Sequence, residues 1–187
     1  MDAAEKVVLD RDGVARALVR MAHEVVERNS DPTSALALVG IHRRGVHLAR
    51  RLHAQVSELL DGPVALGSLD ISFHRDDLGR RPQAPVVHAT EIDFALDGAT
   101  VVIVDDVLFT GRTVRSAIDA LFEYGRPARV QLAVLIDRGH RELPIRPDYV
   151  GKNLPTSLAE RVNASIAEID GSDLVTIGVV PQVGVTA

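Results

Sequence analysis

One short stretch limits what this chain can fold into more than any other. Residues Val101–Val104 are four consecutive β-branched apolar residues, a run typical of a strand covered on both faces, as in a parallel sheet. Apolar side chains then recur at helical spacing from Val114 to Phe122, so a helix is expected to begin near Arg112. A buried strand that leads into a helix predicts an α/β fold, with a mostly parallel twisted sheet and helices on both faces.

The loop between this strand and helix carries groups that suit a sugar phosphate. Asp105 and Asp106 are adjacent carboxylates, which can accept hydrogen bonds from a vicinal diol or bind a metal. Thr110 and Thr113 add hydroxyl groups, and Gly111 lets the backbone approach a ligand closely. The helix N-terminus offers N–H groups and partial positive charge to a phosphate. A diol beside a phosphate describes ribose 5-phosphate; the alternative is a plain strand-to-helix turn with incidental acids.

Strands and helices are expected to alternate along most of the chain. Asp10 or Asp12 can cap a first helix, whose apolar residues repeat from Val14 to Val25. A bulge is expected at Gly67. The expected strands are 6–9, 35–39, 64–73, 86–92, 130–136, 161–169 and 174–179, and a second long helix is expected at about 46–60.

Three further polar loops follow expected strands. The first, a candidate anion site, contains Ile41, His42, Arg43, Arg44 and Gly45; a plain loop with surface arginines is the alternative. A long polar stretch from His74 to Pro82 predicts a flap or a solvated hairpin tip. Asp137–Arg141 follows the strand expected at 130–136. Open α/β sheets bind ligands at the carboxyl ends of their strands, so these loops are expected to meet in one site.

Composition excludes several classes of protein. The chain has 187 residues, 46% of them hydrophobic, and no cysteine, so we expect one domain over residues 1–187 without disulfides. A bilayer-spanning segment of about 20 apolar residues is absent from the sequence, as is a signal peptide, and a cytoplasmic location is expected. The net charge of −5 argues against a globally basic nucleic-acid binder, and 3% aromatic residues argue against a stacking platform for RNA.

Specific motifs resemble a known family. Residues 101–113 resemble the signature that binds 5-phosphoribosyl diphosphate (PRPP) in type I phosphoribosyltransferases. The longer resemblance, from about residue 6 to about 178, is to the PyrR family of pyrimidine-operon regulators and uracil phosphoribosyltransferases. It is carried by Asp70–Ile71, Arg75–Leu78, Tyr124–Pro127 and, above all, Asp137–Ser157. The resemblance implies the type I phosphoribosyltransferase fold, with a small C-terminal hood from about 144 to 180.

The resemblance also implies a reaction: uracil and PRPP give UMP and diphosphate, with Mg²⁺. Asp105 and Asp106 would hold the ribose hydroxyls and are candidate metal ligands, and Asp137 would be a metal partner through water. The PRPP-binding residues implied are Val101, Val102, Ile103, Val104, Asp105, Asp106, Val107, Leu108, Phe109, Thr110, Gly111, Arg112 and Thr113. The diphosphate would lie on a second loop of Ile41, His42, Arg43, Arg44 and Gly45. A flap would be formed by His74, Arg75, Asp76 and Asp77.

The resemblance places base recognition at Phe109, Tyr149, Val150 and Gly151, where the segment Tyr149–Gly151 would cover the base and its backbone groups would read the base edge. The related hypoxanthine-guanine enzymes carry aspartate at the position of Phe109, as a proton acceptor for the purine. Phenylalanine cannot accept that proton, which favours a pyrimidine, whose N1 proton is more acidic. The chain departs from the usual family residues at Arg43, where threonine is usual, at His74, where tyrosine is usual, and at Val19, where threonine is usual.

The resemblance implies binding to a stem-loop in pyrimidine-operon leader mRNA, strengthened by UMP. The implied RNA-binding residues are Arg20, His23, Arg28, His140, Arg141, Arg146 and Lys152, and a homodimer or higher homo-oligomer would join two such patches. Control could act on transcription, by attenuation, or on translation. The alternatives are a salvage enzyme that does not bind RNA and, outside the family, a purine salvage transferase.

Overall fold

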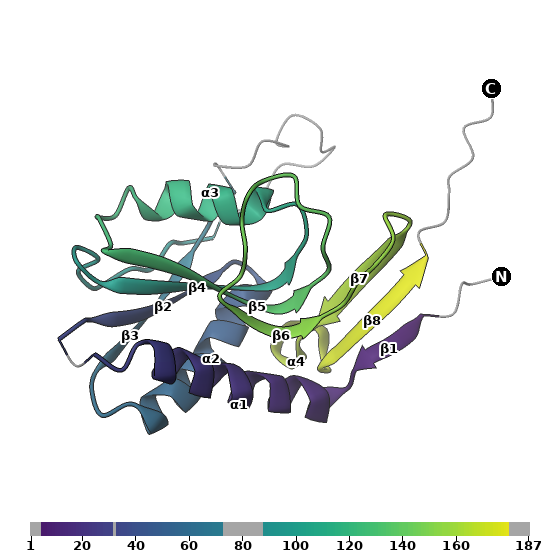
Figure 1. Cartoon of the computed structure of the whole chain (residues 1–187), viewed down its shortest axis with the longest axis horizontal. Coiled ribbons are helices and arrows are strands. Elements are labelled where there is room, and N and C mark those ends of the chain that lie inside the picture. The colour runs from purple at the N-terminus through teal and green to yellow at the C-terminus, as the bar shows by residue number, and fades with distance from the viewer. Residues whose placement is uncertain (1–4, 32, 73–87, 180–187) are drawn as a thin grey trace.

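A five-stranded parallel sheet carries the polar loops predicted from the sequence (Figure 1). The structure is a computed structural model that describes residues 5–31, 33–72 and 88–179. The elements are β1 (Lys6–Leu9), α1 (Arg11–Arg28), β2 (Leu36–Ile41), α2 (Arg44–Leu59), β3 (Val64–Leu69), β4 (Thr100–Leu108), α3 (Arg112–Leu121), β5 (Arg129–Asp137), β6 (Tyr149–Asn153), β7 (Glu160–Ser165), α4 (Ala167–Asp170) and β8 (Leu174–Val179). The main sheet has the order β3-β2-β4-β5-β6.

The central strand β4 is buried on both faces, as its sequence predicted. Val102 and Val104 pack in a core cluster with residues of α1 and α2, whereas Val101 and Ile103 pack in a second cluster with residues of α3. Figure 1 shows α1 and α2 on one side of the sheet and α3 on the other. The α/β class, with helices on both faces, is therefore confirmed.

Helix boundaries follow local signals in the sequence. Asp10 is the N-cap of α1, and its Oδ1 accepts a hydrogen bond of 2.8 Å from the Gly13 N–H, which satisfies one of the unpaired donors at the helix start. α3 begins at Arg112, as predicted, after Gly111 turns the chain with a φ of 94°. That left-handed conformation favours glycine.

The third strand differs from its prediction. β3 ends at Leu69 rather than at Phe73, and the bulge expected at Gly67 is wrong, because Gly67 pairs in regular register with Val39. Glycine is needed there for another reason: a Cβ on Gly67 would lie 2.8 Å from the carbonyl oxygen of Glu91. The strand expected at 86–92 is wrong for residues 88–92, where a single bridge joins Ser68 to Glu91; residues 86 and 87 lie outside the described part.

A smaller antiparallel sheet of β1, β8 and β7 forms the hood. The hood expected from about 144 onward is corrected in two respects. β6 belongs to the main sheet, where it pairs in parallel with β5, and the N-terminal strand β1 pairs with β8. The strand expected at 161–169 is β7 followed by the short helix α4, which ends at Gly171 with a φ of 79°.

In the described part of the chain, none of the helices has the length and apolar character needed to span a bilayer.

Candidate active site

The acid pair lies inside β4 rather than after it. β2 is paired with β4 only as far as Val104, so β4 extends beyond its neighbour at Asp105 and Asp106. Asp105 is buried, with 7% of its surface exposed, and its Oδ1 accepts a hydrogen bond of 2.9 Å from the Asp106 N–H. Asp106 is half-buried and accepts a hydrogen bond of 2.8 Å from the Val107 N–H. Backbone bonds therefore orient both carboxylates at the carboxyl edge of the sheet.

A cavity of about 230 Å³ lies between the end of β4 and the start of α3. Its lining residues are Asp105, Val107, Leu108, Phe109, Thr110, Gly111, Arg112, Thr113, Val114 and Ser116. Within the described residues, the amides of Thr110, Gly111 and Thr113 donate to no protein acceptor. The Arg112 N–H donates to Thr110 Oγ1 at 3.4 Å. This loop has the N–H groups and the helix N-terminus that bind an anion.

The loop after β2 approaches the acid pair directly. A Cβ on Gly45 would lie 2.4 Å from the Val104 carbonyl oxygen, so only glycine lets α2 begin so close to β4. The peptide bond between His42 and Arg43 is cis. The predicted diphosphate loop therefore lies beside Asp105, as the rule for carboxyl ends of parallel strands predicted.

The two arginines of this loop have different surroundings. Arg43 is exposed. Arg44 instead donates from Nε and Nη2 to the two carboxylate oxygens of Asp170 in the hood, each at 2.9 Å. A diphosphate role was predicted for Arg44, whereas its pairing with Asp170 was not.

His42 stacks on His88, with ring centroids 4.7 Å apart and an angle of 3° between the planes. Burial, together with the nearby charge of His88, lowers the pKa of His42. The predicted flap residues His74, Arg75, Asp76 and Asp77 lie outside the described part of the chain. Asp70 precedes that segment and His88 follows it. The His88 N–H donates a hydrogen bond of 2.5 Å to Asp70 Oδ2.

Asp137 and Arg141 connect the end of β5 to the phosphate loop. Arg141 Nη2 lies 2.6 Å from Asp137 Oδ2, and its Nη1 donates to the Phe109 carbonyl at 2.8 Å. Asp137 Oδ1 accepts a hydrogen bond of 3.0 Å from the Gly139 N–H. Arg141 is 20% exposed, so its side chain fixes this loop. The RNA contact of Arg141 stays a prediction.

Comparison with known proteins identifies this arrangement. The model of the phosphoribosyl transferase domain matches residues 7–164. A Bifunctional protein PyrR from Roseiflexus sp. is 59% identical over 167 residues, which cover 89% of this chain and 91% of the relative. A Bifunctional protein PyrR from Pelotomaculum thermopropionicum is 55% identical, with 94% and 97% covered. The chain belongs to the PyrR family.

Solved structures support the same fold. A hypoxanthine phosphoribosyl transferase from Trypanosoma cruzi has a TM-score of 0.72 and 19% identity, and the match covers 98% of this chain and 95% of that one. One from Staphylococcus aureus has a TM-score of 0.68 and 17% identity, with 98% and 96% covered. At this identity the likeness shows the fold alone. This PyrR-family chain therefore has the type I phosphoribosyltransferase fold.

In the predicted base segment of this PyrR-family chain, the neighbouring residues Tyr149 and Val150 lie in different surroundings. The Tyr149 side chain is 1% exposed, and its hydroxyl contacts Gln131 Oε1 and Asn29 Nδ2, each at 3.0 Å. Tyr149 therefore packs against α1 in the core and not in an open site. Its neighbour Val150 instead lines a cavity of about 300 Å³ together with Asp137 and Arg141. The Tyr149 side chain does not line this cavity, and recognition of the base edge by backbone groups of residues 149–151 stays a prediction.

The predicted RNA-binding residues also separate into two groups. His23, Arg146 and Lys152 are exposed and have no ion-pair partner among the described residues. Arg20 donates to the Val150 and Gly151 carbonyls at 2.8 and 2.6 Å, and Arg28 pairs with Asp148 at 2.9 Å. These two arginines are nevertheless half exposed, at 50% and 52% of their side chains.

The His140 ring, also predicted to bind RNA, contacts the Thr156 carbonyl at 2.5 Å. Val19, where the PyrR family usually has threonine, is 46% exposed.

Sequence reasoning missed one residue beside the site. Arg138 is 7% exposed, and its guanidinium carbon lies 4.2 Å from the centre of the Phe109 ring. Arg138 also donates to the Glu160 carbonyl at 2.7 Å and to Thr156 Oγ1 at 3.2 Å. Its place in the Asp137–Arg141 motif was the available signal, but burial of an arginine is decided by the fold.

Proposed function

We propose that this chain forms UMP and diphosphate from uracil and PRPP, and that it regulates pyrimidine-operon expression by binding leader RNA under the control of UMP. One observation carries the enzyme assignment: the acid pair of β4 lies beside a helix N-terminus where, among the described residues, the amides of Thr110, Gly111 and Thr113 donate to no protein acceptor. The first group suits the ribose hydroxyls, and the second suits the 5-phosphate. Relatives at 59% and 55% identity are named Bifunctional protein PyrR, which supports both activities.

In the reaction, the bond between ribose C1 and the diphosphate oxygen breaks, and its electron pair leaves with the diphosphate. A bond then forms between C1 and uracil N1, which loses its proton. The ribose carries positive charge at the transition state, and the nearby carboxylates of Asp105 and Asp106 stabilise it. Arg43 and Arg44 meet the departing diphosphate. Phe109, which cannot accept a proton, favours a pyrimidine over a purine.

The residues present fit a Mg²⁺ ion that is bound partly by carboxylates of the protein and partly by phosphates of the substrate. Among the described residues, no group of three or more His, Cys, Asp or Glu side chains could hold a metal. Mg²⁺ is usually bound by one or two carboxylates together with substrate phosphates, not by a protein cage. Asp105 and Asp106 would supply the carboxylates, with Asp137 acting through water. Bound Mg²⁺ would neutralise charge on the diphosphate.

RNA binding requires exposed cations, because phosphate contacts supply most of the affinity. His23, Arg146 and Lys152 are exposed, and Arg20 and Arg28 are half exposed. A homo-oligomer would join such surfaces from two copies. Replacing Lys152, which does not line the cavity beside Val150, by alanine is expected to weaken RNA binding and to reduce its salt dependence, with UMP formation unchanged.

Two measurements test the proposal. Purified protein is incubated with labelled uracil, PRPP and Mg²⁺, with hypoxanthine in parallel; UMP without IMP is expected, and absence of UMP would refute the enzyme assignment. A pyrimidine-leader RNA is then titrated with protein in the presence and absence of UMP, with a scrambled RNA as the control. RNA retention that UMP does not change would refute the regulatory assignment.

A further inference from the structure

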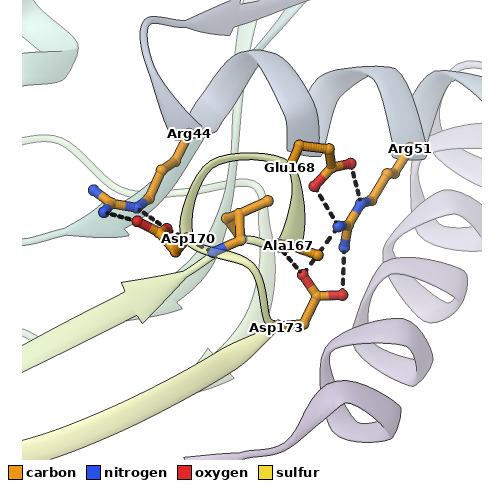
Figure 2. Close-up of polar contacts among 7 residues, drawn as sticks. Arg44, Arg51, Ala167, Glu168, Asp170 and Asp173 are labelled. Carbon is orange, nitrogen blue, oxygen red and sulfur yellow. Dashed lines mark hydrogen bonds and ion pairs between the residues drawn. The ribbon is translucent and has the colours of Figure 1, made fainter.

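The hood is bound to α2 by two arginines that lie seven residues apart, two turns along one face of the helix (Figure 2). Arg51 donates to both carboxylate oxygens of Glu168, from Nε at 2.9 Å and from Nη2 at 2.5 Å, and to both oxygens of Asp173 at 2.9 Å each. Arg44 forms the paired bonds with Asp170. Each arginine thus has its own carboxylate partner in the α4 region.

The two contacts differ in their distance from the reaction. Arg44 is the first residue of α2 and directly precedes Gly45, whose backbone abuts Val104 and Asp105. Arg51 lies two turns further along the helix. The hydrogen bonds that Arg44 donates to Asp170 are the largest cause of its raised pKa, and the negative charges of Asp170 and Asp106 also raise it. Arg44 therefore lies between the hood and the acid pair.

Asp170 is itself held rigidly. Its Oδ2 accepts a second hydrogen bond, of 2.9 Å, from the Ile166 N–H, and its side chain is 22% exposed. Planar pairing fixes both the position and the rotation of a guanidinium. Asp170 uses Nε and Nη2 of Arg44, and among the described residues no group accepts a hydrogen bond from Nη1. One nitrogen of an oriented guanidinium is left for a ligand.

We propose that Asp170 is a positioning residue for PRPP: it holds Arg44 so that Nη1 meets the diphosphate beside the acid pair. This inference rests on the proposed function. Without Asp170, Arg44 would lose rotamer entropy on binding PRPP, because the free side chain samples many conformations. The α4 segment of the hood thereby takes part in binding the leaving group.

The test compares Asp170→Asn with Glu168→Gln, a matched loss of charge in the Arg51 contact. For Asp170→Asn we expect the KM for PRPP to rise about tenfold, the size of effect for one weakened charged hydrogen bond, with the KM for uracil unchanged. Asp170→Glu is expected to recover part of this loss. Glu168→Gln is expected to leave both KM values unchanged, because Arg51 keeps Asp173 and does not reach the site.

Calorimetry separates positioning from a general loss of structure. The Kd for PRPP with Mg²⁺ should rise about tenfold in Asp170→Asn, whereas the Kd for UMP, which lacks the diphosphate, should stay the same. Equal effects of Asp170→Asn and Glu168→Gln, a parallel loss of UMP binding, or tighter PRPP binding in Asp170→Asn would each overturn the proposal. Because PRPP binding is measured without turnover, a wild-type protein that bound PRPP but formed no UMP would refute the proposed function alone. A wild-type protein that bound no PRPP would overturn both.

Discussion

Arg138 lies over the face of the Phe109 ring, 4.2 Å from its centre, and thereby joins the end of β5 to the wall of the phosphate cavity. The contact is buried, and Arg138 donates to the Glu160 carbonyl, in the first residue of hood strand β7, and to the Ser157 carbonyl. Desolvation by burial lowers the pKa of Arg138, while the nearby Glu160 opposes this shift. A single cation therefore links the candidate base-selecting residue to the hood.

Replacing Arg138 by methionine is expected to lower the free energy of unfolding by about 2–4 kcal/mol. The substitution leaves the partly buried Glu160 and Ser157 carbonyls without their donor, and that loss sets the magnitude. Urea denaturation measures the change. Arg138→Lys is the control that keeps the positive charge. If Arg138→Met had the same free energy of unfolding as the wild type, the prediction would be contradicted.

Replacing Asp106 by asparagine is expected to lower kcat/KM for PRPP by about 10–100-fold, the cost of one charge-assisted hydrogen bond. The fold should be unaffected, because the asparagine oxygen can still accept from the Val107 N–H. Steady-state UMP formation gives the kinetic value, and thermal unfolding gives the control. If Asp106→Asn turned over like the wild type, the acid pair would not be the ribose site.

Replacing Tyr149 by phenylalanine is expected to reduce stability without changing the KM for uracil. Its hydroxyl contacts Gln131 and Asn29 in the core, so the loss should be about 1–2 kcal/mol in the free energy of unfolding. Urea denaturation measures the free energy of unfolding, and steady-state kinetics on the same preparation measure the KM for uracil. An altered KM for uracil with unchanged stability would show that the Tyr149 side chain contacts the base.

The contacts between the hood and α2 are expected to weaken in acid. Hydrogen bonds from Arg51 and Arg44 lower the pKa values of Glu168 and Asp170 below their ordinary values of 4.5 and 3.8. A carboxyl that binds protons less readily when folded contributes stability that is fully present above its unfolded pKa and is lost as the pH falls through its folded pKa. The difference in unfolding free energy between wild type and Arg51→Met should therefore narrow below pH 4.5. A difference that stayed constant from neutral pH to acid would contradict this assignment.

Local patterns were sufficient for the elements that carry the site. The apolar run Val101–Val104 predicted the doubly buried strand, because only a strand covered on both faces needs consecutive apolar residues. Asp10 predicted the start of α1, since a carboxylate pairs with the N–H groups of the first helical turn. The order of acids, hydroxyls and glycine predicted the PRPP loop. Each of these signals acts between residues that are close in sequence.

Long-range contacts decided what the sequence left open or stated wrongly. Arg44 was predicted to meet the diphosphate and Arg141 to meet RNA, yet neither protein partner was predicted: Arg44 pairs with Asp170, 126 residues away, and Arg141 pairs with Asp137 and the Phe109 carbonyl. A bulge was predicted at Gly67, since no local signal in the sequence reveals that the Glu91 carbonyl lies close to this glycine. The burial of the Tyr149 side chain against α1 was likewise not evident from the sequence.

By itself, the sequence determined the class of fold, because hydrophobic periodicity is a local property of the chain, and its motifs carried the resemblance to the family. Only the tertiary structure decided which charged side chains are free for ligands and which hold the hood and loops in place. The physical reason is that an arginine is committed by the carboxylates and carbonyls around it, and these come from distant parts of the chain.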